Sequence, residues 1–308
     1  AGGVQVGSGS SNASIGADGK FVVFQSAAPM IAGDGNGKRD IYLKSLDTGA
    51  VTRLSPKFDG TDSDGNSVTP SFSANGNYVV FSSAATNLVG NNNNGKADIF
   101  RKDLATGKIA LVSTAKDGAQ ADAESTRPQV SADGKYVVFE SAATNLVPNH
   151  SGSDRDIFRK DLATGEIVCV STAADGAQGN GASEAPQISA DGRYVVFESN
   201  AENLAPGDNN GMWDIFRKDL QTGEIVRLSA AADRTQANDD SYSASMSADG
   251  RIVAFASEAP NLVPGDTNGA WDIFRVDTAL LPQGPAIAEG RHVRASLYVG
   301  SASSVTVA

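Results

Sequence analysis

The chain has 308 residues, of which 40% are hydrophobic and 20% charged, and its 33 glycines and 11 prolines indicate a folded, turn-rich protein. Its formal net charge is −11, so the chain has no excess of Lys and Arg with which to bind a phosphate backbone. Nucleic acid is therefore excluded as an expected partner. No apolar run approaches the roughly 20 residues of a membrane-spanning helix, so no membrane span is predicted.

The first predicted element is a short β-strand at Val4–Ser8. It follows Ala1-Gly2-Gly3, which has neither an initiator methionine nor a basic leader and fits a processed or trimmed chain. Val4–Ser8 resembles Val226–Ser229, which ends a later repeat, so we expect it to complete the last sheet of the chain.

Five copies of one unit follow. An Asp-Ile pair and an aromatic residue mark each copy and recur every 58 residues, which indicates a repeat architecture. A second landmark, Asp-Gly or Asn-Gly before a hydrophobic run, also occurs once per copy. The Asp-Ile pairs begin at Asp40, Asp98, Asp156, Asp214 and Asp272, and the glycine turns at Asp18, Asn75, Asp133, Asp191 and Asp249.

Each copy is predicted to form four strands. In the second copy, β-rich runs cover 70–73, 78–81, 99–102 and 109–112, separated by turn residues and one polar loop. Helical spacing is absent, and runs such as Val-Val-Phe suit strands buried on both faces. Four-stranded antiparallel sheets set radially hide their edges by closing into a ring. The sequence therefore predicts an all-β, five-bladed β-propeller over residues 1–280, with the N-terminal strand closing the last blade.

Residues 281–308 lie outside the repeat. Pro282 and Pro285 suit a central strand badly, whereas 296–299 and 304–307 alternate like strands. This extension is predicted either to pack on the propeller or to begin a following domain.

The third copy reads Ser-Ala-Asp-Gly-Lys-Tyr-Val-Val-Phe-Glu-Ser at 131–141 and Asp-Ile-Phe-Arg-Lys-Asp-Leu-Ala-Thr-Gly at 156–165. Over about residues 11–280 this pattern resembles the TolB-like β-propeller repeat family of bacteria. The resemblance implies an extracytoplasmic location, which is periplasmic, secreted or on the cell surface. Family members include protein-binding modules and peptidase-associated propellers, and the best-known relative has six blades, so the fold does not fix the activity.

The loop before each Asp-Ile pair predicts a calcium site in copies one, four and five. Oxygen-bearing side chains stand at its first, third and seventh places around a glycine, as a hard cation requires. The alternative is turn chemistry, in which Asx-turns shape the loop and the closing aspartate hydrogen-bonds the backbone. Copy two has Asn92 and Asn94 instead, and copy three has His150. The predicted ligands are Asp34, Asn36, Asp40, Asp208, Asn210, Asp214, Asp266, Asn268 and Asp272.

Trp213 and Trp271 stand at matching positions beside these loops and are predicted either to stack on a sugar ring or to cover the neighbouring blade. A second repeated polar loop begins at Asp117, Asp175 and Asp233. It is predicted to serve as a turn, with a lectin-like glycan pocket as the alternative.

Near-identical blades argue against the unique environment that a catalytic group needs. His150 and His292 are expected at the surface, and Cys169, in an apolar run, is expected to be a structural thiol. The predicted function is therefore a non-enzymatic module that binds a protein or glycan partner. The alternative is a carbohydrate-active enzyme that uses two acids in the central channel. Its candidate acids are Asp62, Asp64, Glu124, Glu184, Asp239 and Asp240.

Overall fold

The computed structural model describes residues 9–57, 59–152 and 154–281, and it divides into two compact units, Ala1–Cys169 and Val170–Ala308. The predicted closing strand at Val4–Ser8, the extension at 282–308 and His292 lie outside the described residues. Within the described residues, no helix is long and apolar enough to cross a bilayer.

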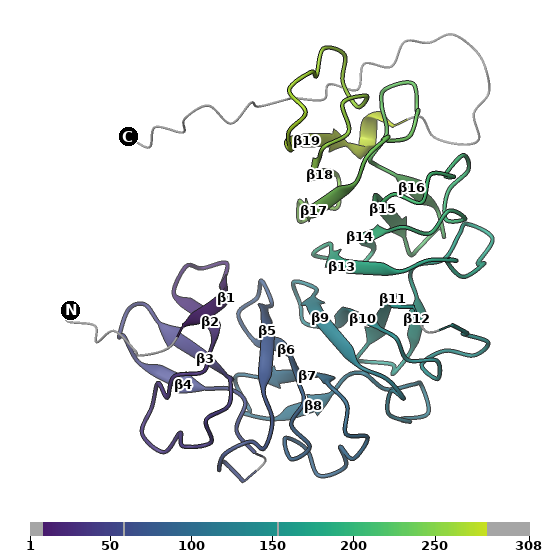
Figure 1. The fold of residues 1–308 in the computed structure, drawn as a ribbon. Helices are drawn as coiled ribbons and strands as arrows, with labels where there is room; N and C mark the ends of the chain where they lie inside the picture. Colours follow the sequence, from purple (N-terminus) through teal and green to yellow (C-terminus); the bar gives the residue numbers. More distant parts are fainter. Residues whose placement is uncertain (1–8, 58, 153, 282–308) are drawn as a thin grey trace, which may run out of the picture. The chain divides into compact units, whose positions relative to one another are not determined.

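The first unit contains three four-stranded antiparallel sheets (Figure 1). In each sheet, neighbouring strands are consecutive in the sequence and hydrogen-bonded to one another. The strands are β1 (Ser10–Ile15), β2 (Phe21–Ser26), β3 (Asp40–Ser45) and β4 (Val51–Arg53); β5 (Ser67–Phe72), β6 (Tyr78–Ser83), β7 (Asp98–Asp103) and β8 (Ile109–Leu111); and β9 (Ser125–Val130), β10 (Tyr136–Ser141), β11 (Asp156–Asp161) and β12 (Ile167–Cys169).

The second unit contains one four-stranded sheet and one sheet with three described strands. The strands are β13 (Ser183–Ile188), β14 (Tyr194–Ser199), β15 (Asp214–Asp219) and β16 (Ile225–Arg227), followed by β17 (Ser241–Met246), β18 (Ile252–Ser257) and β19 (Asp272–Asp277), and the 3₁₀-helix η1 covers Thr278–Leu280. The predicted fold class, an all-β chain of five antiparallel propeller blades, is confirmed.

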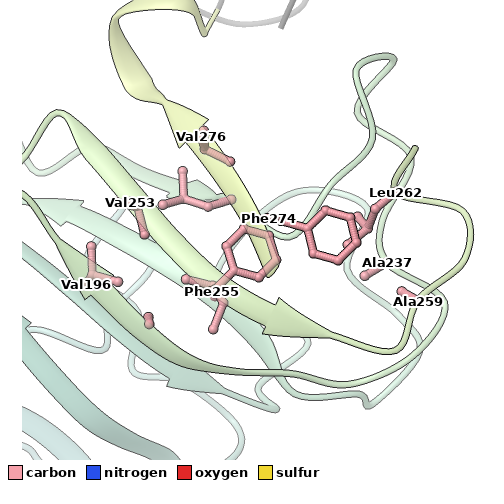
Figure 2. Close-up of a cluster of buried hydrophobic side chains, with 11 residues drawn as sticks. Val196, Ala237, Val253, Phe255, Ala259, Leu262, Phe274 and Val276 are labelled. Carbon is pink, nitrogen blue, oxygen red and sulfur yellow. The ribbon is translucent and has the colours of Figure 1, made fainter. Parts of the chain in front are cut away.

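Every blade has a core pair of stacked aromatic rings, one from its second strand and one from its third. The two residues are direct cross-strand partners, as Phe139 and Phe158 are in the third blade. Figure 2 shows the buried cluster of the second unit, where Phe255 and Phe274 lie between Val253 and Leu262. The centroid distances are 5.9 Å for Phe24–Tyr42, 5.8 Å for Phe81–Phe100, 6.0 Å for Phe139–Phe158, 5.9 Å for Phe197–Phe216 and 5.6 Å for Phe255–Phe274.

A β-bulge interrupts the first strand of each blade and places one non-glycine residue at positive φ, a conformation that sequence reasoning did not predict. In the second blade the backbone N–H of Thr69 (φ 51°) donates to Gln25 Oε1 of the first blade at 2.7 Å. The bulge therefore supplies a donor that links successive sheets. The residues at positive φ are Asn12, Thr69, Arg127, Ala185 and Ser243.

The Asp-Gly turns also join successive blades. Tyr78 of the second blade lies against Gly134 of the third, where a Cβ would overlap its ring. The guanidinium of Arg101 stacks 4.4 Å from the centre of the Tyr78 ring and donates to the Gly134 carbonyl at 2.8 Å. In the second unit, Arg217 stacks at 4.0 Å on Tyr194. Gly250 meets that ring as Gly134 meets Tyr78.

Substituting Gly134 by alanine is expected to destabilise the protein more than the same change at Gly76. Both glycines have φ near 75° (78° and 75°), so both variants carry the strain of a left-handed residue, about 1 kcal/mol. Only Gly134→Ala also crowds a ring, since the nearest atom to a Cβ at Gly76 is 3.9 Å away. The extra loss is about 1–3 kcal/mol. Urea unfolding of both variants measures it, and equal losses would show that the Tyr78 contact contributes nothing.

Candidate functional site

The loop that precedes the third strand occupies the same place in every blade and ends on a buried aspartate. The closing residues Asp40, Asp98 and Asp214 have no exposed surface, and Asp156 and Asp272 are 1% and 4% exposed. A buried carboxylate is costly unless it is hydrogen-bonded or paired with a charge. The groups that satisfy these five aspartates therefore define the chemistry of the loops.

A serine after the fourth strand is the first such group. In the first blade Ser55 Oγ donates to Asp40 Oδ1 at 2.6 Å and accepts from the Ile41 N–H at 3.0 Å. The alternative prediction was that the closing aspartate hydrogen-bonds the backbone directly. Instead, the serine hydroxyl bridges the aspartate carboxylate and the backbone N–H. The same tie joins Ser113 to Asp98 and Ile99, and Ser229 to Asp214 and Ile215.

An arginine at the end of the fourth strand is the second group, in blades one and four. Arg53 Nη1 lies 2.5 Å from Asp62 Oδ1, 3.4 Å from Asp34 Oδ1 and 4.0 Å from Asp40 Oδ2. Arg227 Nη1 lies 3.3 Å from Asp208 Oδ1 and 3.9 Å from Asp214 Oδ2. In these two blades a guanidinium thus stands beside both carboxylates that were predicted to bind calcium.

The asparagine at the third place of the loop shapes the turn. Asn268 Oδ1 accepts from the Ala270 N–H at 2.9 Å, and its Nδ2 donates to Asp272 Oδ2 at 3.0 Å. Asn36 makes the equivalent pair of bonds to Lys38 and Asp40. Asn210 instead donates to the Ala237 carbonyl at 2.7 Å and not to Asp214. The structure therefore joins the predicted Asn and closing Asp directly in blades one and five.

Burial is the largest influence on the pKa values of three closing aspartates, Asp40, Asp98 and Asp214. Desolvation raises the pKa of Asp214 to about 7, against the hydrogen bond from Ser229 and the charge of Arg227, which both lower it. Burial likewise raises the pKa values of Asp40 and Asp98, with hydrogen bonds from Ser55 and Ser113 as the main opposing causes.

Asp214 should make stability depend on pH between about 4 and 7. Its pKa is higher in the folded state than the ordinary 3.8, so the folded state binds the proton more tightly. The unfolding free energy therefore decreases as the pH rises through this window, by up to about 1.4 kcal/mol per unit from this group. We expect Asp214→Asn to remove that part of the slope in urea unfolding.

Asp219→Asn is the matched control for this experiment. Burial is the largest single cause and raises the pKa of Asp219. The Arg193 ion pair and the hydrogen bonds from Gln221 and Thr222 together outweigh it and lower this pKa to about 2, so the titration of Asp219 falls below the window. A slope equal in Asp214→Asn and the unsubstituted protein would contradict the assignment.

In the third blade the same place holds different chemistry. His150 Nε2 lies 2.9 Å from Asp156 Oδ2, and the side chains of both residues are 2% exposed. One ligand atom each from His150, Asp156 and Cys169 lie within 4.8 Å of one another. The expectation of a surface histidine at His150 was wrong. Aligning the copies would have found the cluster, because His150 takes the place of Asp34 and Cys169 that of Arg53.

Trp213 and Trp271 belong to a row of three rings in the second unit. The Tyr242 ring of β17 lies 6.0 Å from Trp213 and 5.9 Å from Trp271, centre to centre. The Tyr242 hydroxyl donates to Asp240 Oδ2 at 3.2 Å, and burial with the charge of Asp240 raises the pKa of Tyr242 to about 12. Sequence reasoning missed Tyr242 because its place in the repeat is not aromatic in the other copies.

Several of the candidate acids for hydrolysis accept bonds that shape the loops. Asp62 pairs with Arg53, and Asp64 accepts from the Thr86 N–H at 2.8 Å and its hydroxyl at 2.5 Å. Asp239 accepts from the Asp240 N–H at 2.9 Å. Asp240 accepts from the Trp213 N–H at 2.9 Å.

The second polar loop is closed by an isolated bridge, such as Thr114 to Gln120, and by local bonds. The Ala119 N–H donates to Asp117 Oδ1 at 3.0 Å, and the same bond recurs at Asp175 and Asp233. These bonds are the turn chemistry predicted for this loop.

Comparison with models of known protein families gives no match, and neither does comparison with curated proteins. Solved structures do match. TolB from Acinetobacter baumannii is 21% identical with a TM-score of 0.50, over 88% of this chain and 52% of that one. The chain has the β-propeller fold of TolB. It spans about half the length of that TolB chain, and at this identity the likeness extends to the fold alone.

Other structures with the TolB-type fold have different activities. An oligogalacturonate lyase in complex with manganese is 16% identical with a TM-score of 0.53, over 86% of this chain and 61% of that one. The propeller domain of the Trilobed protease from Pyrococcus furiosus is 13% identical with a TM-score of 0.52, over 88% of this chain and 69% of that one. The activity must therefore be argued from this chain's own residues.

Proposed function

We propose that the chain is a non-catalytic binding module that acts outside the cytoplasm and holds a protein or glycan partner. The observation that carries the proposal is the structural use of four candidate acids: Asp62, Asp64, Asp239 and Asp240 all accept bonds that shape loops. A hydrolase needs a pair of acids directed at substrate, one to protonate and one to attack or activate water. The extracytoplasmic location is supported by the resemblance of the repeats to the TolB-like family.

The contact surface that we propose is the aromatic row of Trp213, Tyr242 and Trp271. Trp271 is 48% exposed, and Met212, which adjoins Trp213, is 37% exposed. Aromatic and methionine side chains give large contact areas at binding surfaces, and Asp240 beside Tyr242 offers a carboxylate to hydroxyl or ammonium donors. A sugar face or a protein loop with such donors suits this combination.

Trp271→Ala is expected to weaken partner binding at least about tenfold, because a buried aromatic anchor contributes roughly 2 kcal/mol or more. Leu46→Ala is the matched control, since Leu46 is 49% exposed but lies in the first unit. A glycan array identifies a carbohydrate partner, and a photo-cross-linker at position 271 captures a protein partner. Undiminished binding by Trp271→Ala would contradict the surface. Turnover of a polysaccharide that one acid-to-amide substitution abolishes would contradict the non-catalytic module.

We also propose that calcium stiffens the loop of blade five. In blades one and four, calcium would have to displace the guanidinium of Arg53 or Arg227. In blade five, Asp266, Asn268 and Asp272 supply oxygen-bearing side chains, and no arginine pairs with them among the described residues. A turn of Asn268 would direct its amide oxygen, in place of its nitrogen, towards an ion.

Calcium is therefore expected to raise the melting midpoint relative to chelator. An ion bound only by the folded state stabilises it by about 2.7 kcal/mol at one hundred times its dissociation constant. Asp266→Asn should remove most of the shift, whereas Asp34→Asn should leave it unchanged. An identical midpoint in calcium and in chelator would contradict calcium binding.

A further inference from the structure

Blade three brings together three different metal-binding side chains. His150 lies in the loop before β11, Asp156 is the first residue of β11, and Cys169 is the last residue of β12. Their nitrogen, oxygen and sulfur ligand atoms all lie within 4.8 Å of one another. No other group of three His, Cys, Asp or Glu side chains within the described residues meets this condition.

In two other blades, an arginine occupies the position equivalent to Cys169. Arg53 and Arg227 stand where Cys169 stands, 116 residues before and 58 residues after it, and each directs a guanidinium at the closing aspartate and at the residue equivalent to His150. In blade three this fixed positive charge is replaced by a thiol, while the aspartate stays buried. The fold thus provides a cation position whose occupant differs between blades.

We propose that blade three binds a divalent cation of the zinc type through His150, Asp156 and Cys169. Imidazole nitrogen and thiolate sulfur select borderline metals such as zinc or cobalt, whereas calcium and magnesium require oxygen ligands. Three protein ligands leave the fourth tetrahedral position for water or for a group of a partner. The thiol releases its proton to solvent when the metal binds.

The geometry requires little adjustment. Ligand atoms 2.0–2.3 Å from a shared ion are roughly 3.5 Å apart in a tetrahedral site, so the widest separation has to close by about 1 Å. The scaffold is held on both sides, because Cys169 is the cross-strand partner of Phe158. The His150 ring packs on the same phenylalanine, with centres 5.2 Å apart. The site therefore lies on a strand pair and on the aromatic core of its blade.

Cobalt is the spectroscopic probe for this site. Titration of the full, reduced chain with Co²⁺ should produce d–d absorption bands typical of tetrahedral cobalt, together with a thiolate-to-cobalt charge-transfer band. Both should saturate at one Co²⁺ per chain. Added Zn²⁺ should displace the cobalt and abolish both. Cys169→Leu and His150→Asn copy the residues that blade two has at these places, Leu111 and Asn92, so the chain itself shows that the fold accepts them. Cys169→Leu should abolish the charge-transfer band, and His150→Asn should weaken metal binding by at least about tenfold.

His292→Asn, which removes the other histidine of the chain, is the control and should leave both bands unchanged. A second measurement uses only the unsubstituted protein: Zn²⁺ should slow alkylation of Cys169, the single thiol, and calcium should not. Absence of a charge-transfer band together with equal alkylation rates with and without Zn²⁺ would overturn the proposal. A band that persists in Cys169→Leu would also overturn it.

Discussion

A carboxylate buried at the start of the third strand is the constraint on which the loops of every blade depend. The side chains of Asp40 and Asp98 have no exposed surface, and burial raises the pKa values of both. The serine hydroxyl after the fourth strand donates to this carboxylate and accepts from the next backbone N–H of the third strand, so it ties the two together. Because this tie fixes where the loop ends, the remaining loop residues are arranged around a nearly constant centre.

The blades differ in how they compensate that centre. An arginine supplies the charge in blades one and four, Asn94 and Ser113 supply hydrogen bonds in blade two, and His150 does so in blade three. The repeat therefore fixes the position of the buried aspartate but not the type of side chain that satisfies it. The uniformity of the blades argues for a binding module. That uniformity applies to the strands and the buried aspartates, whereas the side chains that satisfy each aspartate differ from blade to blade.

The 58-residue period and the alternation of β-rich runs with turns predicted the strands of the second copy within three residues, because backbone structure here follows local patterns. The compensating groups were not predicted. Arg53 and Asp34 are far apart in sequence, and only strand pairing brings them together. Burial of His150 was missed for the same reason, since a single histidine in a polar loop gives no periodic signal. The bulges escaped prediction because their residues share no type.

All three metal-binding candidates of the third blade fall between positions 150 and 169, well inside one repeat. Duplication or recombination in units of one repeat would therefore transfer the whole set, whereas a site shared by two blades would be split. Repeat number and site number can change together in such a gene without any new geometry having to arise. A propeller that grows by copying its third repeat would acquire a second cluster in the same step.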